Sequence, residues 1–423
     1  MTGRTNITGG GMNLNAEVQE FTVANGKNVV SGDFVSWRTV KKESVLTYSD
    51  IEQGKTEQVG ENLVVTQSGE ALYLLEMVNG NLRIVSSYSE KPVGGFCIMQ
   101  DGGIAVAVKS SPYLVRLVVG NANLEVSSEA QNVSVTIPTP FGVEEKDGKL
   151  YVLGRYSAFE VRLYPFTYSA GGMTLESSTY IEINLGNNIS GLDWTGAFSA
   201  SGNIFIISNY VQGNRFVYKI AFNSGNTTVK TEQVSEKGLK TLFPVSFFDK
   251  YVIFSSSYNL YIYNAETEEM KEIDMHGFGF PATDSYTAAN RNSAFAKHGD
   301  NELAIFFNGG GSSYLSAVVF RVANSGNLEM ASNIFKLKFE SASVTTATNM
   351  YLFFVGNSVN PTCYASNATR CISSTYDSAS EQLTDYVEPN YVEPYTGGLA
   401  IGVAKQSGKS GQTIEVYVAK PSA

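Results

Sequence analysis

The ends of the chain carry the stretches that decide its fold: NLNAEVQEFTVANGKNVVSGDFVSW at residues 13–37 and GLAIGVAKQSGKSGQTIEVYV at residues 398–418. In both, apolar side chains alternate with polar or small residues around Gly-containing turns, a pattern typical of β-hairpins. Each half has one apolar face that it cannot bury alone. We therefore expect the two ends, residues 13–44 and 386–423, to fold together as one small split β-barrel of about four or five strands.

Between these ends, a short polar turn followed by a strand of aliphatic and aromatic residues recurs. The turns begin at Ser68, Asp101, Asp147, Ser201, Asp249, Asp300 and Thr348. Their spacings are 33, 46, 54, 48, 51 and 48 residues, close to the roughly 40–50 residues of one propeller blade. A second turn follows in all units but the seventh, at Asn79, Gly120, Gly171, Ser224, Ala265 and Ser325.

Two turns in one unit predict about four antiparallel strands, which is one blade. The fold class that follows is all-β: a β-propeller of about seven blades over residues 45–385, inserted into the small β-barrel. Six or eight blades, a long jelly roll and a β-solenoid are the alternatives. Residues 1–12 are expected to be a flexible arm. We expect DYVEPNYVEPYTGG (385–398) to be an extended exit linker, with RTVKKES (38–44) as the entry segment.

Composition excludes several classes of function. The net charge of −10 argues against non-specific binding to nucleic acid or to an anionic membrane. No apolar run approaches the roughly 20 residues of a spanning helix, and the opening lacks the apolar stretch of a secretory signal. We therefore expect assembly in a cytoplasm, where free thiols at Cys363 and Cys371 are favoured over a disulfide that closes a small loop.

The terminal segments resemble the small β-barrel head decoration, or capsid-stabilising, proteins of tailed bacteriophages and prophages. The matching residues are Val30, Gly32, Asp33 and Val35, then Gly402, Val403, Ala404, Gly408, Gly411, Ile414 and Val416. This chain departs from that family by carrying the propeller-like insertion between the two halves. The resemblance implies a virion structural protein that forms a symmetric oligomer, often a trimer, and docks on the major capsid protein or another virion protein.

Catalytic and metal-binding patterns are scarce. The two histidines, His276 and His298, have no recognisable nucleophile motif nearby, and the G-x-S-x-G and H-E-x-x-H motifs are absent. No Cys or His spacing fits zinc. A carboxylate pair for glycoside cleavage leaves no sequence motif and stays open. We expect no enzyme activity, no metal and no cofactor.

Two long loops are candidates for ligand recognition, because exposed aromatic side chains in loops suit sugars. The first, residues 274–292, contains His276, Phe278, Phe280, Tyr286 and Arg291. The second, residues 186–196, contains Asp193 and Trp194. The alternative is that Trp194, Phe278 and Phe280 fill space between blades.

Three functions remain. The first is a capsid decoration protein on the virion surface that docks through its barrel and displays the propeller outward, with a host-surface glycan as the possible ligand. The second is a receptor-binding adhesin of the tail fibre or baseplate. The third is a cellular propeller that binds or cleaves glycans.

Overall fold

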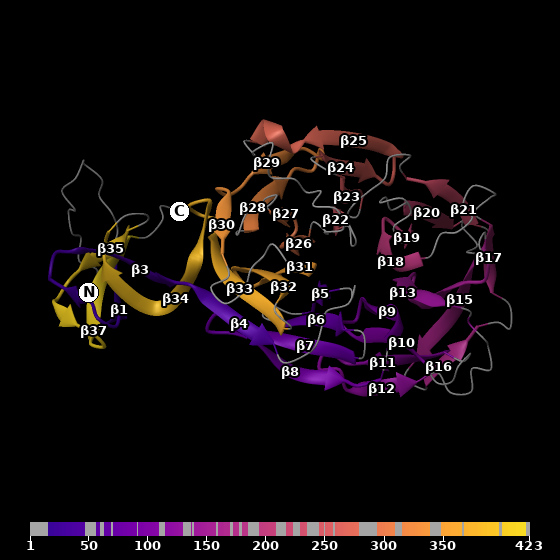
Figure 1. Cartoon of the computed structure of the whole chain (residues 1–423), viewed down its shortest axis with the longest axis horizontal. Coiled ribbons are helices and arrows are strands. Elements are labelled where there is room, and N and C mark those ends of the chain that lie inside the picture. The colour runs from indigo at the N-terminus through magenta and orange to yellow at the C-terminus, as the bar shows by residue number, and fades with distance from the viewer. Residues whose placement is uncertain are drawn as a thin grey trace.

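The computed structural model describes residues 16–46, 56–59, 63–68, 71–90, 92–109, 115–129, 137, 139–157, 160–169, 172–176, 180–184, 194–208, 217–222, 229–234, 245–248, 250–256, 259–278, 294–308, 315–338, 348–365, 368–396 and 400–419. Within these ranges the chain is all-β, as predicted, and the one helical element is a single 3-10 turn, η2 (Met275–Phe278). Figure 1 shows a large multi-sheet body and, beside it, a smaller module that contains both ends of the described chain.

Six antiparallel sheets of four or five strands follow one another along the chain. The first three are β5 (Thr56–Gln58), β6 (Leu63–Ser68), β7 (Ala71–Val78) and β8 (Asn81–Tyr88); β9 (Pro92–Ile98), β10 (Ile104–Lys109), β11 (Val115–Gly120) and β12 (Val126–Glu129); and β13 (Pro140–Lys146), β14 (Lys149–Arg155), β15 (Glu160–Ser169), β16 (Gly172–Leu175) and β17 (Ile181–Asn184).

The next three sheets have the same order. They are β18 (Trp194–Ala200), β19 (Asn203–Ser208), β20 (Val217–Phe222) and β21 (Val229–Gln233); β22 (Val245–Phe247), β23 (Tyr251–Ser256), β24 (Asn259–Asn264) and β25 (Glu269–Asp274); and β26 (Ala294–His298), β27 (Glu302–Asn308), β28 (Leu315–Val322), β29 (Leu328–Met330) and β30 (Phe335–Leu337). In each sheet the first strand lies towards the middle of the body and the last towards its rim (Figure 1).

The seventh sheet contains strands from both ends of the chain. Strands β31 (Thr348–Val355), β32 (Ser358–Ala365) and β33 (Ala368–Asp377) pair in sequence. The far edge of β33 then pairs with β4 (Lys42–Leu46) along residues 369–373 and with β34 (Gln382–Pro394) along residues 374–377. An early strand and a late strand thus complete the same sheet.

Two of the expected repeat turns lie elsewhere in their units. The turn at Ser68 joins the second and third strands of its sheet rather than the first and second, which explains the short first spacing. The expected turn at Thr348 is wrong, because Thr348 and Asn349 lie inside β31 and the reversal comes at residues 356–357. The same polar residues favour a turn at every hairpin. They therefore show where the chain reverses direction but not which two strands of a sheet the turn connects.

Hydrophobic clusters join each sheet to the next. Among the described residues, separate clusters link the first and second sheets, the second and third, the third and fourth, the fourth and fifth, the fifth and sixth, and the sixth and seventh. A further cluster, made of Val64, Leu75, Leu82 and Cys371, links the first sheet to the seventh. Each sheet is therefore stabilised by burial against two neighbours.

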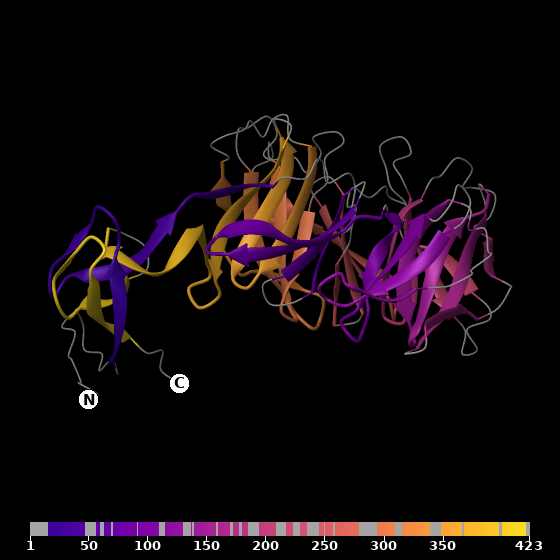
Figure 2. The same cartoon turned by 90° about the horizontal axis from the view of Figure 1, so that it is seen from below.

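The smaller body, here called the terminal module, is built from β1 (Ala16–Val23), β3 (Phe34–Val40), β35 (Ala400–Ala404), β37 (Thr413–Ala419) and the second half of β34. Their order is β1-β37-β35-β3-β34, and β1 also pairs in parallel with β34. Two short strands, β2 (Asn28–Val29) and β36 (Gly408–Lys409), pair with each other. Figure 2 shows the terminal module at one end of the described chain and the multi-sheet body beside it.

The segments expected to be linkers form a paired ribbon. Thr39 lies opposite Val387 and Val40 opposite Tyr386, so β3 and β34 leave the terminal module side by side and enter the seventh sheet. The register shifts between Trp37 and Thr39, where β34 carries Pro389 and Asn390, the latter with φ of 69°. A bulge accommodates a proline that lacks a ladder donor, so the Tyr-Val-Glu-Pro repeat stays within a strand.

Candidate functional site

Most residues of the predicted docking motif stabilise the interior of the terminal module. Val35, Ile414 and Val416 belong to its buried core, together with Phe21, Val23, Val29, Val392 and Ala404. Gly402 and Gly408 are close-packed: a Cβ on Gly402 would lie 2.2 Å from the carbonyl oxygen of Tyr417, and one on Gly408 would lie 2.3 Å from Ile414. These glycines allow strands and a turn to approach one another.

Other motif residues shape the turn that leads into β3. Asp33 accepts a hydrogen bond from the Val30 amide through its carboxylate at 2.8 Å, and its own amide donates to the Val30 carbonyl. Gly32 and Gly411 have φ of 96° and 77°, which glycine adopts without strain. The Val30 side chain, in contrast, is 59% exposed. Of the aliphatic motif residues, only Val30 and Val403 lie outside the buried core, Val30 exposed and Val403 half-buried.

A row of apolar side chains crosses the outer face of the module. The strand registers place Val18 opposite Tyr417, Tyr417 opposite Val403, and Val403 opposite Phe34. Phe34 in turn accepts a hydrogen bond through its carbonyl from the amide of Tyr395, which follows β34. Because paired residues point to the same side of a sheet, these five residues share a face, here called the apolar row.

The apolar row is exposed most strongly at one end. Phe34 is 51% exposed and Tyr395 is 42% exposed, whereas Val18, Val403 and Tyr417 are half-buried. A charged pair borders the apolar row. Lys405, directly after β35, contacts Glu415 of β37 at 2.6 Å, and this hydrogen bond raises the pKa of Lys405. An apolar centre with a charged edge is the usual anatomy of a protein interface.

The candidate ligand loops lie mostly outside the described residues. Four of the candidate residues lie outside them: Asp193, Phe280, Tyr286 and Arg291. For Trp194 in β18 and His276 in η2, only the main chain is described. Phe278 packs edge-to-face on the buried Phe320, with ring centres 5.1 Å apart. Its position matches the space-filling alternative.

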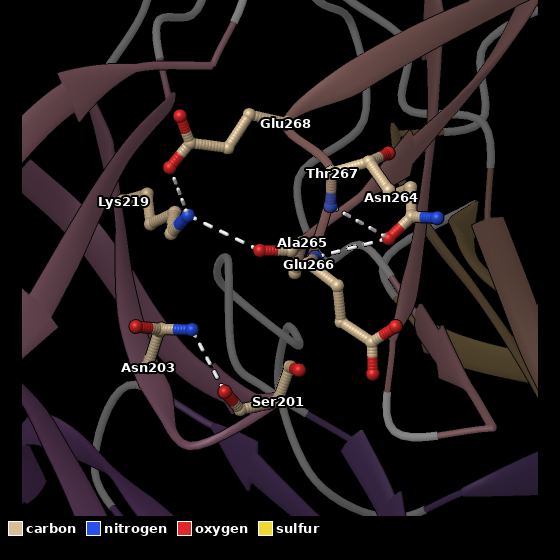
Figure 3. Close-up of polar contacts among 8 residues, drawn as sticks. All are labelled: Ser201, Asn203, Lys219, Asn264, Ala265, Glu266, Thr267 and Glu268. Atoms are coloured by element: carbon tan, nitrogen blue, oxygen red, sulfur yellow. Dashed lines mark hydrogen bonds and ion pairs between the residues drawn. The ribbon is translucent and has the colours of Figure 1, made fainter.

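A buried lysine joins the fourth and fifth sheets (Figure 3). Lys219 of β20 is 5% exposed, and its ammonium group donates to Glu268 at 2.7 Å and to the Ala265 carbonyl at 3.2 Å. The turn that receives it is held by Asn264, whose side-chain oxygen accepts from the amides of Glu266 and Thr267. A buried charge needs such partners, so Lys219 fixes the boundary between two sheets.

A second polar cluster lies between the sixth and seventh sheets. Glu302 contacts His298 Nδ1 at 2.7 Å and accepts a hydrogen bond from the Tyr376 hydroxyl at 2.9 Å. The His298 ring stacks on Phe354, with ring centres 4.3 Å apart. Burial, and then the bond to Glu302, raises the pKa of Tyr376. The cluster therefore satisfies polar groups that would otherwise be buried without partners.

The part of the chain that the structure describes contains neither a cluster of metal ligands nor a membrane-spanning helix. There, no group of three or more His, Cys, Asp or Glu side chains is placed to hold a metal ion. Cys97 and Cys371 are buried thiols. The described ranges contain no helix with the length and apolar character needed to cross a membrane.

Comparison with known proteins gives no family. No family model matches the chain, and no curated protein matches it. Among solved structures, a chain of a mitotic checkpoint complex is similar at 10% identity, covering 81% of this chain and 97% of that one, with a TM-score of 0.47.

Two further structures are similar to the same degree. A putative 6-phosphogluconolactonase from Bacteroides uniformis shares 12% identity over 79% of this chain and 99% of that one, with a TM-score of 0.46. The apocarotenoid oxygenase of Synechocystis shares 8% identity over 66% and 70%, with a TM-score of 0.45. At such scores we draw no conclusion about fold or function from these likenesses.

Proposed function

We propose that the chain is a virion structural protein of a tailed bacteriophage, a capsid decoration protein that docks through its terminal module. The observation that carries this proposal is the apolar row. A module that has already buried its own core still exposes aromatic side chains on its outer face, with Phe34 51% and Tyr395 42% exposed. Apolar surface of this kind marks sites of protein association.

We also propose that the multi-sheet body is a closed seven-bladed β-propeller inserted into a split β-barrel. The support is the sequence of clusters that joins each sheet to the next and the first sheet to the seventh. For the barrel, it is the parallel pairing of β1 with β34, which connects the two ends of the strand order.

Docking through the terminal module would leave the multi-sheet body displayed on the outside of the virion. The partner of the terminal module is the major capsid protein or another virion protein, and a homo-oligomer, with a trimer favoured, matches capsid symmetry. The body faces outward on the virion surface, where a host glycan is its candidate ligand. We propose no enzyme activity. A tail adhesin with the same two parts is the second candidate.

Reconstitution on virions that lack this protein tests the docking surface. Phe34→Asp places a charge in the apolar row without touching the module core, so it should abolish co-sedimentation with the particles. Val85→Asp is the matched control, because Val85 is 50% exposed on the multi-sheet body, and it should bind as the wild type does. Equal binding by both variants would contradict docking through the row.

Electron cryo-microscopy of the reconstituted particles then separates the two viral placements. Density on the capsomers, with the module inward and the body outward, is the expected result. Density at the tail tip would favour the adhesin. The absence of density from both places would overturn the viral proposals.

A further inference from the structure

We propose that the folded terminal module holds the first and seventh sheets together, so that the multi-sheet body opens at this boundary when the module unfolds. This coupling is a property of the isolated chain, whether or not the module docks on a virion. Chain connectivity is the first reason for it. Each of the other neighbouring pairs of sheets is consecutive in sequence, whereas β31, β32 and β33 of the seventh sheet are separated from the first sheet by the whole length of the body.

Among the side chains that the structure describes, the direct apolar contact at this boundary is small. Among the described side chains, the shared cluster has four buried members, Val64, Leu75, Leu82 and Cys371, and only Cys371 comes from the seventh sheet. A polar contact lies beside it, where the Ser373 hydroxyl contacts the Met77 sulfur at 3.8 Å. Tyr73, Met77 and Ile84 of the first sheet pack against this cluster while only partly buried, so the described side chains give limited stabilisation against opening.

The stronger contacts come from the two strands of the ribbon. Ser44 of β4 accepts a hydrogen bond from the Leu82 amide at 3.1 Å. The ring of Tyr386 in β34 lies over Gly80, so closely that a Cβ on Gly80 would be 2.6 Å from it. Gly80 and Leu82 belong to the first sheet, and both of their partners lie on strands that connect to the terminal module.

The ribbon is in turn held together by pairing and charge. Glu388 contacts Arg38 and Lys42, each at 3.4 Å, and Glu43 contacts Arg370 of β33 at 3.1 Å. Beyond the bulge, Trp37 pairs with Val392, and Val35 pairs with Pro394 inside the module. The far end of the ribbon is therefore fixed by the module's own core.

Loop-closure entropy connects these observations. Without the module, bringing the first sheet to the seventh means joining the ends of a long chain, which costs conformational entropy. The folded module removes that cost beforehand, because it holds residues 40 and 386 as direct partners across two strands. The boundary contacts then form at a high effective concentration.

Hydrogen exchange of the full chain, read by mass spectrometry, tests this coupling. Gly408→Val forces side-chain atoms into the space between Ile414 and Val23, which lie 2.3 Å and 3.1 Å from a Cβ at this position, and should unfold the module. Ile414→Asp is a second route to the same state. Lys409→Val, at the exposed neighbouring position, is the control and should exchange like the wild type.

The expected result is a local opening, because regions of a protein can unfold separately. When the module loses protection, β7, β8 and β33 should exchange at least about tenfold faster, while β19 and β20 change by less than about twofold. Wild-type protection of β7, β8 and β33 in a protein whose residues 413–419 exchange freely would overturn the proposal.

A disulfide that replaces the folded module gives a second test, which still decides the question if the multi-sheet body of the Gly408→Val variant fails to fold. Thr39→Cys together with Val387→Cys places a disulfide across directly opposed residues of the ribbon. In the Gly408→Val background, the oxidised form should recover the protection of β7, β8 and β33 although the module stays unfolded, and reduction should remove it again. No recovery on oxidation would contradict a role for the ribbon.

Discussion

Two boundaries between sheets use the same contact and support it differently. Between the fifth and sixth sheets, Tyr251 lies over Gly326, where a Cβ would be 2.9 Å from its ring. Between the seventh and first sheets, Tyr386 lies over Gly80, where a Cβ would be 2.6 Å from the tyrosine ring. Both glycines have positive φ, 77° and 75°.

The difference lies in what holds each tyrosine. Tyr251 begins β23, an interior strand of its sheet, and its hydroxyl donates to the Asn324 carbonyl at 3.0 Å. Tyr386 lies on β34, where the strand leaves the seventh sheet for the terminal module. The same contact between a tyrosine ring and a glycine can therefore belong to a fixed boundary or to one that depends on a second folded unit.

The largest expected effect comes from leucine truncation at each boundary. Leu303 and Leu75 are both 0% exposed, in the fifth–sixth and first–seventh clusters respectively. We expect Leu303→Ala to lower the free energy of unfolding by about 4–5 kcal/mol and Leu75→Ala by about 2–3 kcal/mol, because a small cluster collapses more easily around a cavity. Urea unfolding followed by circular dichroism measures both, and equal losses would remove the distinction.

The next effect concerns the two glycines. Alanine at either position meets a tyrosine ring and an unfavourable backbone conformation, so each change should cost about 1–3 kcal/mol. Gly326→Ala should cost more than Gly80→Ala, since Tyr251 is fixed by its hydroxyl and Tyr386 can move with β34. Chemical unfolding of the two variants measures both losses in the free energy of unfolding. A larger loss for Gly80→Ala would contradict the expectation that Tyr386 can move with β34.

Alkaline conditions should weaken the first–seventh boundary in particular. Burial, and then the carboxylate of Glu388, raises the pKa of Tyr386. A phenol whose pKa is raised by folding contributes stability below its unfolded pKa of about 10, and that stability is lost as the pH rises through the folded value.

Tyr386→Phe should therefore reduce the loss of thermal stability above about pH 10, as measured by melting temperatures across that range. Tyr218→Phe is the control, because burial raises the pKa of Tyr218 as well but in the fourth sheet. Only the Tyr386 variant should slow alkaline exchange of β7 and β8. Equal slowing of exchange in both variants would show that ionisation of Tyr386 has no specific effect on the first–seventh boundary.

The smallest effect is that of the ribbon ion pairs. Glu388, Arg38 and Lys42 have side chains that are 21%, 28% and 25% exposed, so solvent screens their attraction. We expect Glu388→Gln to cost less than about 1 kcal/mol and to remove part of the salt dependence of stability. Melting curves at low and high salt test this, and an unchanged salt dependence would assign the ribbon's stability to strand pairing alone.

Sequence patterns located the strands better than they located the surfaces. Alternation placed Ile414 and Val416 on an inner face, and both are buried. It did not single out Phe34, Tyr395 or Tyr417, because these aromatic residues stand at outer positions among polar ones such as Glu415. Period-two alternation assigns a residue to a face and does not say which outer residues form a surface for association.

The ribbon was missed for a related reason. Proline at 389 and 394 argues for an extended linker, and it does so whether the segment is free or paired. The pairing depends on residues 38–40, which are remote in sequence and contact β34 only in the folded chain. The signal available beforehand was charge: Arg38 and Lys42 in the entry segment complement Glu388 in the exit segment.

Strand β34 also determines how the molecule bears mechanical load. A pull that separates the multi-sheet body from the terminal module runs along β34 and β3, which extend from one to the other (Figure 1). Each strand is continuous from one unit to the other, so this pull is carried by two covalent backbones in parallel and leaves the ladder hydrogen bonds between them, which lie perpendicular to the strands, largely unloaded. The ribbon therefore resists tension along its length and yields most readily to a force applied across it.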